Sequence, residues 1–458
     1  MFVPKLEKSI GIEAYATNSL GIGGIIRQHA EDFVVNEVLV DGSIAETDSS
    51  VKRQVLGAST SKNHYLLCAL SKRNWDTFLA LEVIARQLNI DTKRIQIAGI
   101  KDAKAVTAQH ITIEDMSAEE IAKIQAKDIK INPIGYLRNK ISAYFLLGNN
   151  FHITIKTITH SKSTIKKRTA ETISQIKTIG EVPNFFGHQR FGTTRPITHL
   201  VGKTLVKGDF RKAAMLFLAK PSSHEHPETR QAREQLQATQ NFREALKNFP
   251  RKLHYERLML RHLAIKPDDY VGAFRRLPIK LRKLFPQAYQ SFLFNRFLSR
   301  RIADGIPLNK AEVGDYVVNV ERSGLPMLNM YRIMNAQTIK EINKAIKAGR
   351  MRIAIPLIGF KTHLSEGLQG EIEREILEEE CILPKNFEIS AMPEIGSRGE
   401  LRTVTVPLSN FSIDKISNDS ANPSKRQAEL SFMLYRGSYA TIVLREIMKP
   451  RDLIAAGF

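Results

Sequence analysis

The loop formed by residues 99–109, GIKDAKAVTAQ, contains the side chain best suited to chemistry, the carboxylate of Asp102. Lys101 precedes it and Lys104 follows two positions later, and neighbouring positive charge favours the ionised form of a carboxylate. An ionised carboxylate can attack a carbon atom as a nucleophile or remove a proton as a base. Read alone, however, the loop favours a solvated turn aspartate, so other segments have to decide.

A second segment, residues 182–192 with the sequence VPNFFGHQRFG, combines three phenylalanines with Asn184 and other polar side chains. Rings that can stack on bases, next to amide and guanidinium groups, suit the recognition of unpaired nucleotides. The alternative is a turn in the core, in which Phe185, Phe186 and Phe191 are simply buried. The polar side chains between the rings argue against that alternative.

Two further segments place basic or aromatic side chains near the ends of the chain. Residues 27–37, RQHAEDFVVNE, contain Arg27 and Phe33, and residues 437–449, GSYATIVLREIMK, contain Tyr439 flanked by small residues. Each segment is a weak signal alone. Tyr439 could merely begin a strand, and the acidic pair before Phe33 is more often a turn than an acid/base pair.

Short strands and two helices are predicted around these segments in the first part of the chain. Residues 21–40 read as a strand, a polar turn and a second strand, and a polar loop follows from about Thr47 to Asn63. A helix is predicted over residues 75–90 with Asn74 as its N-cap, and another over residues 162–179, ending at Gly180. Four more strands are predicted, at residues 64–70, 94–100, 110–115 and 151–159.

The rest of the chain changes character at about Gly208, where long helical patterns begin. Strand patterns return at residues 315–320 and 352–360, and a helix is predicted over residues 370–382. Residues 412–427 read as an exposed loop and residues 430–448 as two strands. Because strands and helices mix without a regular alternation, the predicted class is α+β, and the length of 458 residues indicates at least two domains.

The charge of the chain indicates an anionic partner. There are 68 Lys and Arg residues against 47 Asp and Glu, a formal net charge of +21, and residues 243–301 alone carry a surplus of 11. Nucleic acid is the leading partner, although this basic stretch could also be a solvated helical surface. A membrane is not expected, because no apolar run reaches the ~18 residues of a spanning helix.

Several other kinds of site are not supported. No phosphate-binding or dinucleotide-binding glycine motif is complete, so a nucleotide cofactor is not expected. His224 and His226 lie in a proline-containing loop and are predicted to be exposed rather than to bind a metal. Cys68 and Cys381 are predicted to be buried thiols, and two cysteines exclude a cysteine zinc cluster. The first residues do not form a secretory signal, so a cytoplasmic location is expected.

Taken together and in order, the four segments resemble the TruD family of tRNA pseudouridine synthases. The family patterns xxxEDFxVxE, GxKDxxAxTxQ, NxFGxQRFG and GSxATxxxRE all occur here. The resemblance implies a pseudouridine-synthase-type catalytic domain with a mixed or antiparallel sheet, formed by residues 1–204 and 404–458. It also implies an inserted α+β domain over residues 205–403, a looser match that includes the helical pattern of residues 287–302.

The resemblance also implies the site. Asp102 matches the catalytic aspartate, Arg27 a basic residue of the active-site cleft, and Phe33, Asn184 and Tyr439 the positions that hold the target nucleotide. The sequence has Arg where the bacterial pattern has Lys at position 27, and Tyr where it has Phe at position 439. These differences keep the charge and the ring, and the added hydroxyl of Tyr439 has no assigned role.

The implied reaction is the isomerisation of a uridine in tRNA, typically uridine 13, although related members modify other RNAs. It breaks the N1–C1′ bond, turns the uracil over and joins C5 to C1′, without redox chemistry, so neither a cofactor nor a metal is expected. The nucleotide must be flipped out of its stack to be reached. A non-catalytic RNA-binding or RNA-folding protein on the same scaffold is the alternative, whereas a metal-dependent nuclease would need clustered carboxylates. The oligomeric state stays open.

Overall fold

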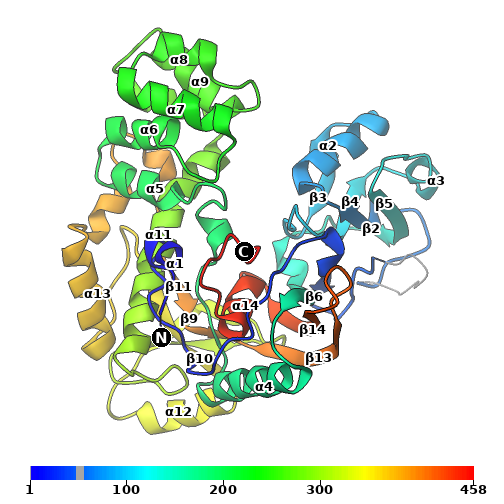
Figure 1. Ribbon diagram of the computed structural model, residues 1–458, viewed down its shortest axis with the longest axis vertical. Helices are drawn as coiled ribbons and strands as arrows, with labels where there is room; N and C mark the ends of the chain where they lie inside the picture. Colours follow the sequence, from blue (N-terminus) through cyan, green and yellow to red (C-terminus); the bar gives the residue numbers. More distant parts are fainter. Residues whose placement is uncertain (1, 48–55) are drawn as a thin grey trace. The chain divides into compact units, whose positions relative to one another are not determined.

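The computed structural model describes residues 2–47 and 56–458, and its elements cluster into two units (Figure 1). Unit 1 comprises Met1–Ala16, Pro183–Glu321 and Pro326–Thr405, and unit 2 comprises Thr17–Val182, Arg322–Leu325 and Val406–Phe458. The chain passes between the units at five points, two of which fall within the short strands β7 (Val182–Pro183) and β12 (Thr405–Val406). Residues 1–16 and 183–204, which the sequence assigned to the catalytic domain, therefore cluster with the middle of the chain.

Unit 2 is built on one mixed sheet of eight strands, in the order β13-β14-β6-β1-β4-β2-β5, with β3 also pairing with β4. Only β1 and β4 run parallel to each other; the other pairs are antiparallel. The strands are β1 (Phe33–Leu39), β2 (Tyr65–Arg73), β3 (Ile95–Ile97), β4 (Val106–Glu114), β5 (Ile129–Leu137), β6 (Leu146–Ile158), β13 (Leu408–Asn418) and β14 (Arg426–Tyr435).

The helices of unit 2 are α2 (Thr77–Gln87), α3 (Ala118–Ile121), α4 (Lys162–Thr178) and α14 (Ala440–Met448), with 3-10 turns η1 (Ala30–Asp32), η2 (Thr92–Arg94) and η3 (Ala143–Phe145). Helix α2 packs on alternate residues of β2, namely Leu66, Cys68 and Leu70, which share one face of the sheet. Burial of each such leucine contributes ~1.5–3 kcal/mol. This cluster fixes α2 against the strands that flank the loop of Asp102.

Unit 1 combines helices with a small antiparallel sheet, ordered β11-β10-β8-β9. Helix α11, 25 residues long, contacts α5, α13 and β10 and so forms the centre of this unit (Figure 1). The helices are α1 (Lys5–Ser9), α5 (Thr198–Val206), α6 (Phe210–Ala219), α7 (Pro227–Thr239), α8 (Phe242–Asn248), α9 (His254–Leu263), α10 (Tyr270–Arg275), α11 (Ile279–Ala303), α12 (Ile339–Lys347) and α13 (Gly367–Glu379). The strands are β8 (Tyr316–Val320), β9 (Pro326–Ile333), β10 (Met351–Leu357) and β11 (Glu400–Thr403), and short 3-10 turns lie at η4 (His188–Arg190), η5 (Pro384–Glu388) and η6 (Pro393–Ile395).

The α+β class is confirmed, and so are most of the predicted elements. The helix that was expected to end at Gly180 is α4, and Gly180 has a left-handed φ of 101°. The N-cap of α2 was predicted wrongly. Asp76, not Asn74, accepts hydrogen bonds from the second and third helical residues, while Asn74 takes a left-handed φ of 54° in the preceding turn.

Three predictions near the chain ends were wrong in whole or in part. The first strand expected within residues 21–40 is only an isolated bridge between Ile25 and Lys156. The expected loop at residues 412–427 is confined to residues 419–425, because residues 412–418 belong to strand β13, which alternates exposed polar and half-buried apolar residues against β14. The second strand expected within residues 430–448 is helix α14, which is buried on every side. The β-branched residues Thr441, Ile442 and Val443 near its start favour a strand, and the tertiary packing of the helix overrides that preference.

Other expectations concern single residues. Cys68 is buried as predicted, but Cys381 is exposed because it follows the last turn of α13 with a left-handed φ of 50°. His224 and His226 are exposed, as predicted. Residues 48–55 of the predicted polar loop lie outside the described residues. Among the described residues, no helix has both the length and the apolar character to cross a bilayer.

Candidate active site

The loop that carries Asp102 connects β3 to β4 and is fixed at its backbone from both sides. The side-chain amide of Gln109, on β4, donates to the carbonyl of Gly99 at 3.1 Å. The hydroxyl of Thr77, at the start of α2, exchanges hydrogen bonds with both the amide and the carbonyl of Lys101, each at 3.2 Å. Because one anchor lies on the sheet and the other on α2, the cluster under α2 sets the position of Asp102.

Lys72, the penultimate residue of β2, holds the same loop one residue further on. Its ammonium group donates to the carbonyl of Asp102 at 2.8 Å and to the carbonyl of Trp75 at 2.7 Å. Burial lowers the pKa of Lys72 to about 8, although Asp102 and Asp76 act in the opposite direction. Lys72 therefore has a structural role, because its hydrogen bonds to two backbone carbonyls fix the loop that carries the Asp102 carboxylate.

Lys101 does not face Asp102, contrary to the role that the sequence suggested for it. Its ammonium group lies 2.7 Å from a carboxylate oxygen of Glu37, on β1, and donates to Oδ1 of Asn149, on β6, at 2.8 Å. The side chains of Lys101 and Glu37 are 3% and 0% exposed, so this is a buried ion pair. The other Glu37 oxygen accepts from the backbone amide of His110 at 3.0 Å.

The charge balance of this pair follows from its contacts. Burial by itself would raise the pKa of Glu37, but the Lys101 ammonium group and the contacts from His110 outweigh burial and hold that pKa below its ordinary value. Lys101 is therefore the counter-ion of Glu37 and not of Asp102. Lys104, the other lysine near Asp102, is exposed and forms no ion pair with it.

Arg27 is the cation that contacts Asp102. Its Nη2 lies 3.1 Å from Oδ1 of Asp102, and its guanidinium carbon lies 4.0 Å from the centre of the Phe33 ring. Burial lowers the pKa of Arg27, while Asp102 acts in the opposite direction. Its backbone has a left-handed φ of 57°, which a non-glycine residue adopts only when the surroundings impose it, often at functional sites.

Phe33 supports Arg27 from within the sheet. Its ring is 1% exposed and packs edge-on against Phe151, with the ring centres 6.1 Å apart. Stacked on this ring and paired with a carboxylate, the guanidinium group has few other orientations open to it. The structure thus brings Arg27, Phe33 and Asp102 into one row of direct contacts.

Asp102 itself remains available. Its side chain is 33% exposed, and only one oxygen, Oδ1, is engaged by Arg27. The second oxygen, Oδ2, accepts no hydrogen bond from the described residues. A carboxylate fixed through its backbone and one oxygen, with the other oxygen accessible, can act as a nucleophile or as a base without further rearrangement.

The remaining two predicted site residues are placed differently. Tyr439 lies in unit 2 as the N-cap residue of α14 and is half-buried, outside the row of contacts around Asp102. Asn184 lies in unit 1 and is 7% exposed. Its amide nitrogen donates to the carbonyl and the hydroxyl of Thr403, and its oxygen accepts from Arg402 at 2.6 Å. The neighbouring rings of Phe185, Phe186 and Phe191 are all buried, as in the core alternative.

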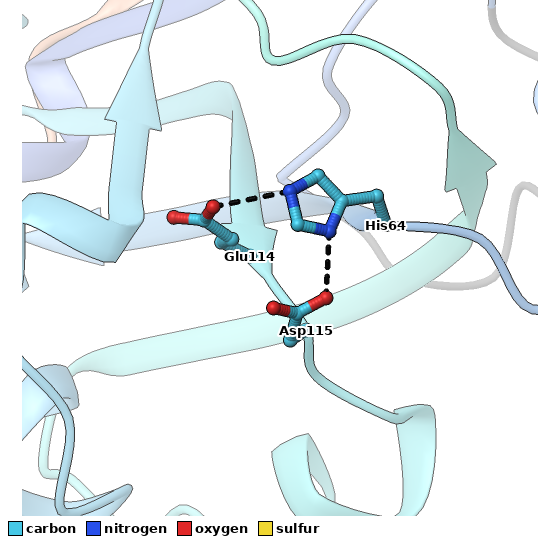
Figure 2. A group of neighbouring side chains, drawn as sticks. All are labelled: His64, Glu114 and Asp115. Carbon is cyan, nitrogen blue, oxygen red and sulfur yellow. Dashed lines mark hydrogen bonds and ion pairs between the residues drawn. The ribbon is translucent and has the colours of Figure 1, made fainter.

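A separate polar cluster lies at the opposite end of β4 and is shown in Figure 2. His64 has its Nε2 3.1 Å from Glu114 and its Nδ1 2.6 Å from Asp115. In the described part of the chain this is the only group of three such side chains close enough to share a metal ion. Since the two carboxylates engage different ring nitrogens, the arrangement is an imidazole clamped between two acids rather than an open chelate.

Comparison with known proteins gives this geometry its context. A family model described as tRNA pseudouridine synthase D (TruD) matches residues 9–447. The chain belongs to the TruD family. A relative from Methanosarcina acetivorans, named tRNA pseudouridine synthase D, is 42% identical over 99% of both chains. A relative of the same name from Thermococcus sibiricus is 35% identical over 95% of this chain and 97% of its own.

The fold of this TruD family member agrees with a solved structure. A crystal structure of the tRNA pseudouridine synthase D from Methanosarcina mazei superimposes with a TM-score of 0.82 at 41% identity, covering 98% of this chain and 99% of that one. The α+β architecture is therefore that of a pseudouridine synthase, as the motifs predicted. The chain is an enzyme of the isomerase class.

Sequence reasoning missed the residues that support the TruD loop, namely Glu37, Lys72, Thr77 and Gln109. Two of them could have been noticed in the sequence. Glu37 and Lys72 are charged residues inside strands that are mostly apolar, and charged residues are almost never buried without a partner. Thr77 and Gln109 left no comparable signal, because their partners are backbone atoms that only the fold brings near.

Proposed function

We propose that this protein converts one uridine of tRNA, uridine 13, into pseudouridine, with Asp102 as its catalytic carboxylate. The observation that carries the proposal is that Asp102 is fixed in position while one of its carboxylate oxygens stays accessible. Its backbone is bound by Lys72, one oxygen is held by Arg27 and the other oxygen is unengaged in a side chain that is one-third exposed. Membership in the TruD family supports tRNA as the substrate, and the motif resemblance supports uridine 13.

The chemistry is an isomerisation in which atoms balance without a second substrate. The N1–C1′ bond breaks, the uracil turns over, the C5–C1′ bond forms, and the proton lost from C5 is balanced by one gained at N1. No electron acceptor or group donor is required, so we propose that no cofactor takes part. Asp102 acts either by attack on C1′ or by removal of a proton from the sugar, and both routes place Oδ2 against the ribose.

The other predicted site residues take roles that follow from their surroundings. Arg27 orients Asp102, and Phe33 acts through Arg27 because its ring is buried beneath the guanidinium group. Tyr439, which is half-buried, offers the more accessible ring for the flipped base. We propose that Asn184 also contributes to holding the nucleotide, through the backbone geometry that its hydrogen bonds to Thr403 and Arg402 fix.

We further propose that residues 1–204 and 404–458 form the catalytic domain and that residues 205–403 form the inserted domain, which contributes basic surface for RNA. The stretch 243–301, with its surplus of 11 positive charges, lies within that region. Since the substrate is tRNA, we place the protein in the cytoplasm. Structured RNAs other than tRNA with a suitable unpaired uridine are secondary substrates.

The test compares wild type with Asp102→Asn on a tRNA transcript that contains uridine 13 and on one in which that position is cytidine. Pseudouridine is located by reverse-transcription stops after carbodiimide treatment, and tRNA binding is measured in parallel by filter retention. We expect modification at position 13 by wild type only, with binding by both proteins.

Asp128→Asn is the matched control, because Asp128 has the same 33% side-chain exposure and lies in the same unit. It should retain full activity. Binding by wild type without any pseudouridine would instead support the non-catalytic RNA-binding alternative. Full activity of Asp102→Asn would disprove the role of Asp102, and modification at another uridine would disprove the choice of site.

A further inference from the structure

Unit 1 contains a pocket that the proposed reaction does not use. It lies on the four-stranded sheet, where β8, β9 and β10 meet the segments that follow β10 and precede β11, and it has a volume of about 350 Å³. The residues that matter for its chemistry are Tyr316, Tyr331, Lys361, His363 and Arg398. We call it the sheet pocket. A volume of this size is within the range of small-ligand sites.

Two glycines build the wall of the sheet pocket. The backbone amides of Phe360 and Lys361 donate to the carbonyls of Ser397 and Arg398 at 2.9 and 3.0 Å, so two loops lie directly against each other. A Cβ atom on Gly359 would come within 2.1 Å of the amide nitrogen of Gly399, a distance no side chain could occupy. Only glycine permits this approach, which brings Lys361 and Arg398 into one pocket wall.

The floor of the sheet pocket is aromatic. Tyr316, on β8, is buried and donates its hydroxyl to the carbonyl of His363 at 3.1 Å. Tyr331, on β9, meets it edge-on with ring centres 5.4 Å apart. Tyr331 is 51% exposed and lies on an edge strand, so a face of its ring is open to a ligand. Sheets with exposed aromatic side chains provide stacking surfaces for unpaired bases.

The rim of the sheet pocket is positively charged. Its two cations, Lys361 and Arg398, are exposed, and no carboxylate of the described residues lies within ion-pair distance of either. Glu400 is the one acidic residue in the lining. On α11, by contrast, Arg282, Arg296 and Arg300 are each paired with a glutamate. Cations held apart from carboxylates beside an open ring fit a ligand that is both planar and anionic.

We propose that the sheet pocket binds an unpaired nucleotide of the RNA substrate, with its base stacked on Tyr331 and its phosphates on Lys361 and Arg398. This inference rests on the proposed function for the identity of the RNA, but it concerns a site apart from Asp102 and contributes binding rather than catalysis. An acidic peptide would satisfy the charges but would leave the ring without a partner, so we favour RNA.

The test uses a fluorescein-labelled pentamer of 4-thiouridine, with binding followed by anisotropy and crosslinked peptides mapped by mass spectrometry. Tyr331→Ala should weaken binding at least about five-fold, while Tyr331→Phe, which keeps the ring, should bind as wild type. Lys361→Glu combined with Arg398→Glu should also reduce the slope of log affinity against log salt by about 0.7 for each phosphate that the variant no longer neutralises. The crosslink should map to β9.

Arg332→Glu is the matched control, because Arg332 is exposed on the same strand but alternation points it to the other face of the sheet. It makes the same change of charge as Lys361→Glu alone and should leave the anisotropy and the crosslink unaltered. Equal loss in Arg332→Glu and Lys361→Glu, or unchanged binding by Tyr331→Ala, would overturn the proposal. So would displacement of the pentamer by a glutamate pentapeptide that binds more tightly.

Failure of this proposal and failure of the proposed function give different results. If wild type forms pseudouridine and Tyr331→Ala does so with the same kcat/KM and the same pentamer affinity, the sheet pocket is refuted and the activity stands. If wild type forms no pseudouridine while the pentamer still crosslinks to β9, the sheet pocket is supported and the activity is refuted.

Discussion

Glu37→Gln tests whether the buried ion pair beneath the loop positions Asp102. Glutamine keeps the shape and can still accept from the amide of His110, but it leaves the Lys101 ammonium group, 3% exposed, without its counter-charge. Removal of one partner from a buried pair costs about 3–5 kcal/mol. For a urea dependence of ~1–3 kcal/mol per molar, unit 2 should unfold at a urea concentration lower by roughly 1 M or more.

The chain contains a local reporter for this measurement. Trp75 is its single tryptophan, lies in unit 2 and packs against the cluster under α2, so its fluorescence follows the unfolding of that unit. Pseudouridine formation by Glu37→Gln should fall about 10- to 100-fold, because a displacement of about 1 Å in a catalytic group has that effect.

The pH dependence gives a second check on the same pair. The pKa of Glu37 is lowered in the folded state, so the stability that it contributes is present above its ordinary pKa of 4.5 and is lost as the pH falls through the lower folded value. The difference in urea midpoint between wild type and Glu37→Gln should therefore be constant from pH 8 to 5 and shrink below about 4.5.

Two further variants separate this pair from surface charge. Glu37→Gln combined with Lys101→Met removes both charges and should recover most of the lost stability. Glu31→Gln breaks an ion pair of the same unit with Arg73 that is about half exposed, and it should unfold like wild type. Equal midpoints for Glu37→Gln and wild type at pH 7.5, or a double variant less stable than either single one, would refute the reasoning.

Three other predictions follow from the contacts of the site and of unit 1. Lys72→Met removes the hydrogen bond to the carbonyl of Asp102 and should lower kcat about 10- to 100-fold with little change in tRNA affinity, measured by single-turnover kinetics. Arg27→Lys keeps the charge beside Asp102 and should retain activity within about ten-fold, whereas Arg27→Ala should lose far more in the same assay. Burial lowers the pKa of His199 to about 4, so the unfolded chain binds a proton near pH 6.5 that the folded chain does not bind until the pH is much lower. Acidification from pH 7.5 to 4 should therefore destabilise wild type by ~3 kcal/mol, measured by urea titrations followed by circular dichroism.

Each of these has an outcome that would contradict it. For Lys72→Met, it is a loss of tRNA affinity equal to the loss of kcat, and for position 27 it is an equal loss in the Lys and Ala variants. His199→Phe preserves the packing of the ring between Phe191 and Phe292 and should flatten the pH dependence. If it leaves the acid destabilisation unchanged, His199 is not its source.

The sequence by itself determined the α+β class and the main strands of unit 2. The strand around Ile153 alternates apolar and polar residues, as a half-buried strand does, and the strand around Leu66 is a short continuous apolar run, as a buried strand is. The sequence did not determine the secondary structure of the segments near the chain ends. Helix α14 contains near its start Thr441, Ile442 and Val443, β-branched residues that favour a strand, whereas the fold makes this segment a buried helix in which Arg445 pairs with Glu446.

The sequence likewise identified Asp102 as the candidate carboxylate, with Arg27 and Phe33, because these residues stand in motifs whose order and types are specific. Proximity in the sequence, however, wrongly suggested Lys101 as the positive charge that acts on Asp102. Lys101 is next to Asp102, yet successive residues of an extended loop point in different directions, and its ammonium group lies against Glu37.

Only the tertiary structure decided which cation meets the carboxylate. Arg27 is 75 positions away from Asp102, and the two come together because the chain before β1 and the loop before β4 lie at the same end of two parallel neighbouring strands. The buried ion pair of Glu37 with Lys101 anchors that loop to β1. A buried charge must find its partner wherever the fold places one, and that partner need not be near in the sequence.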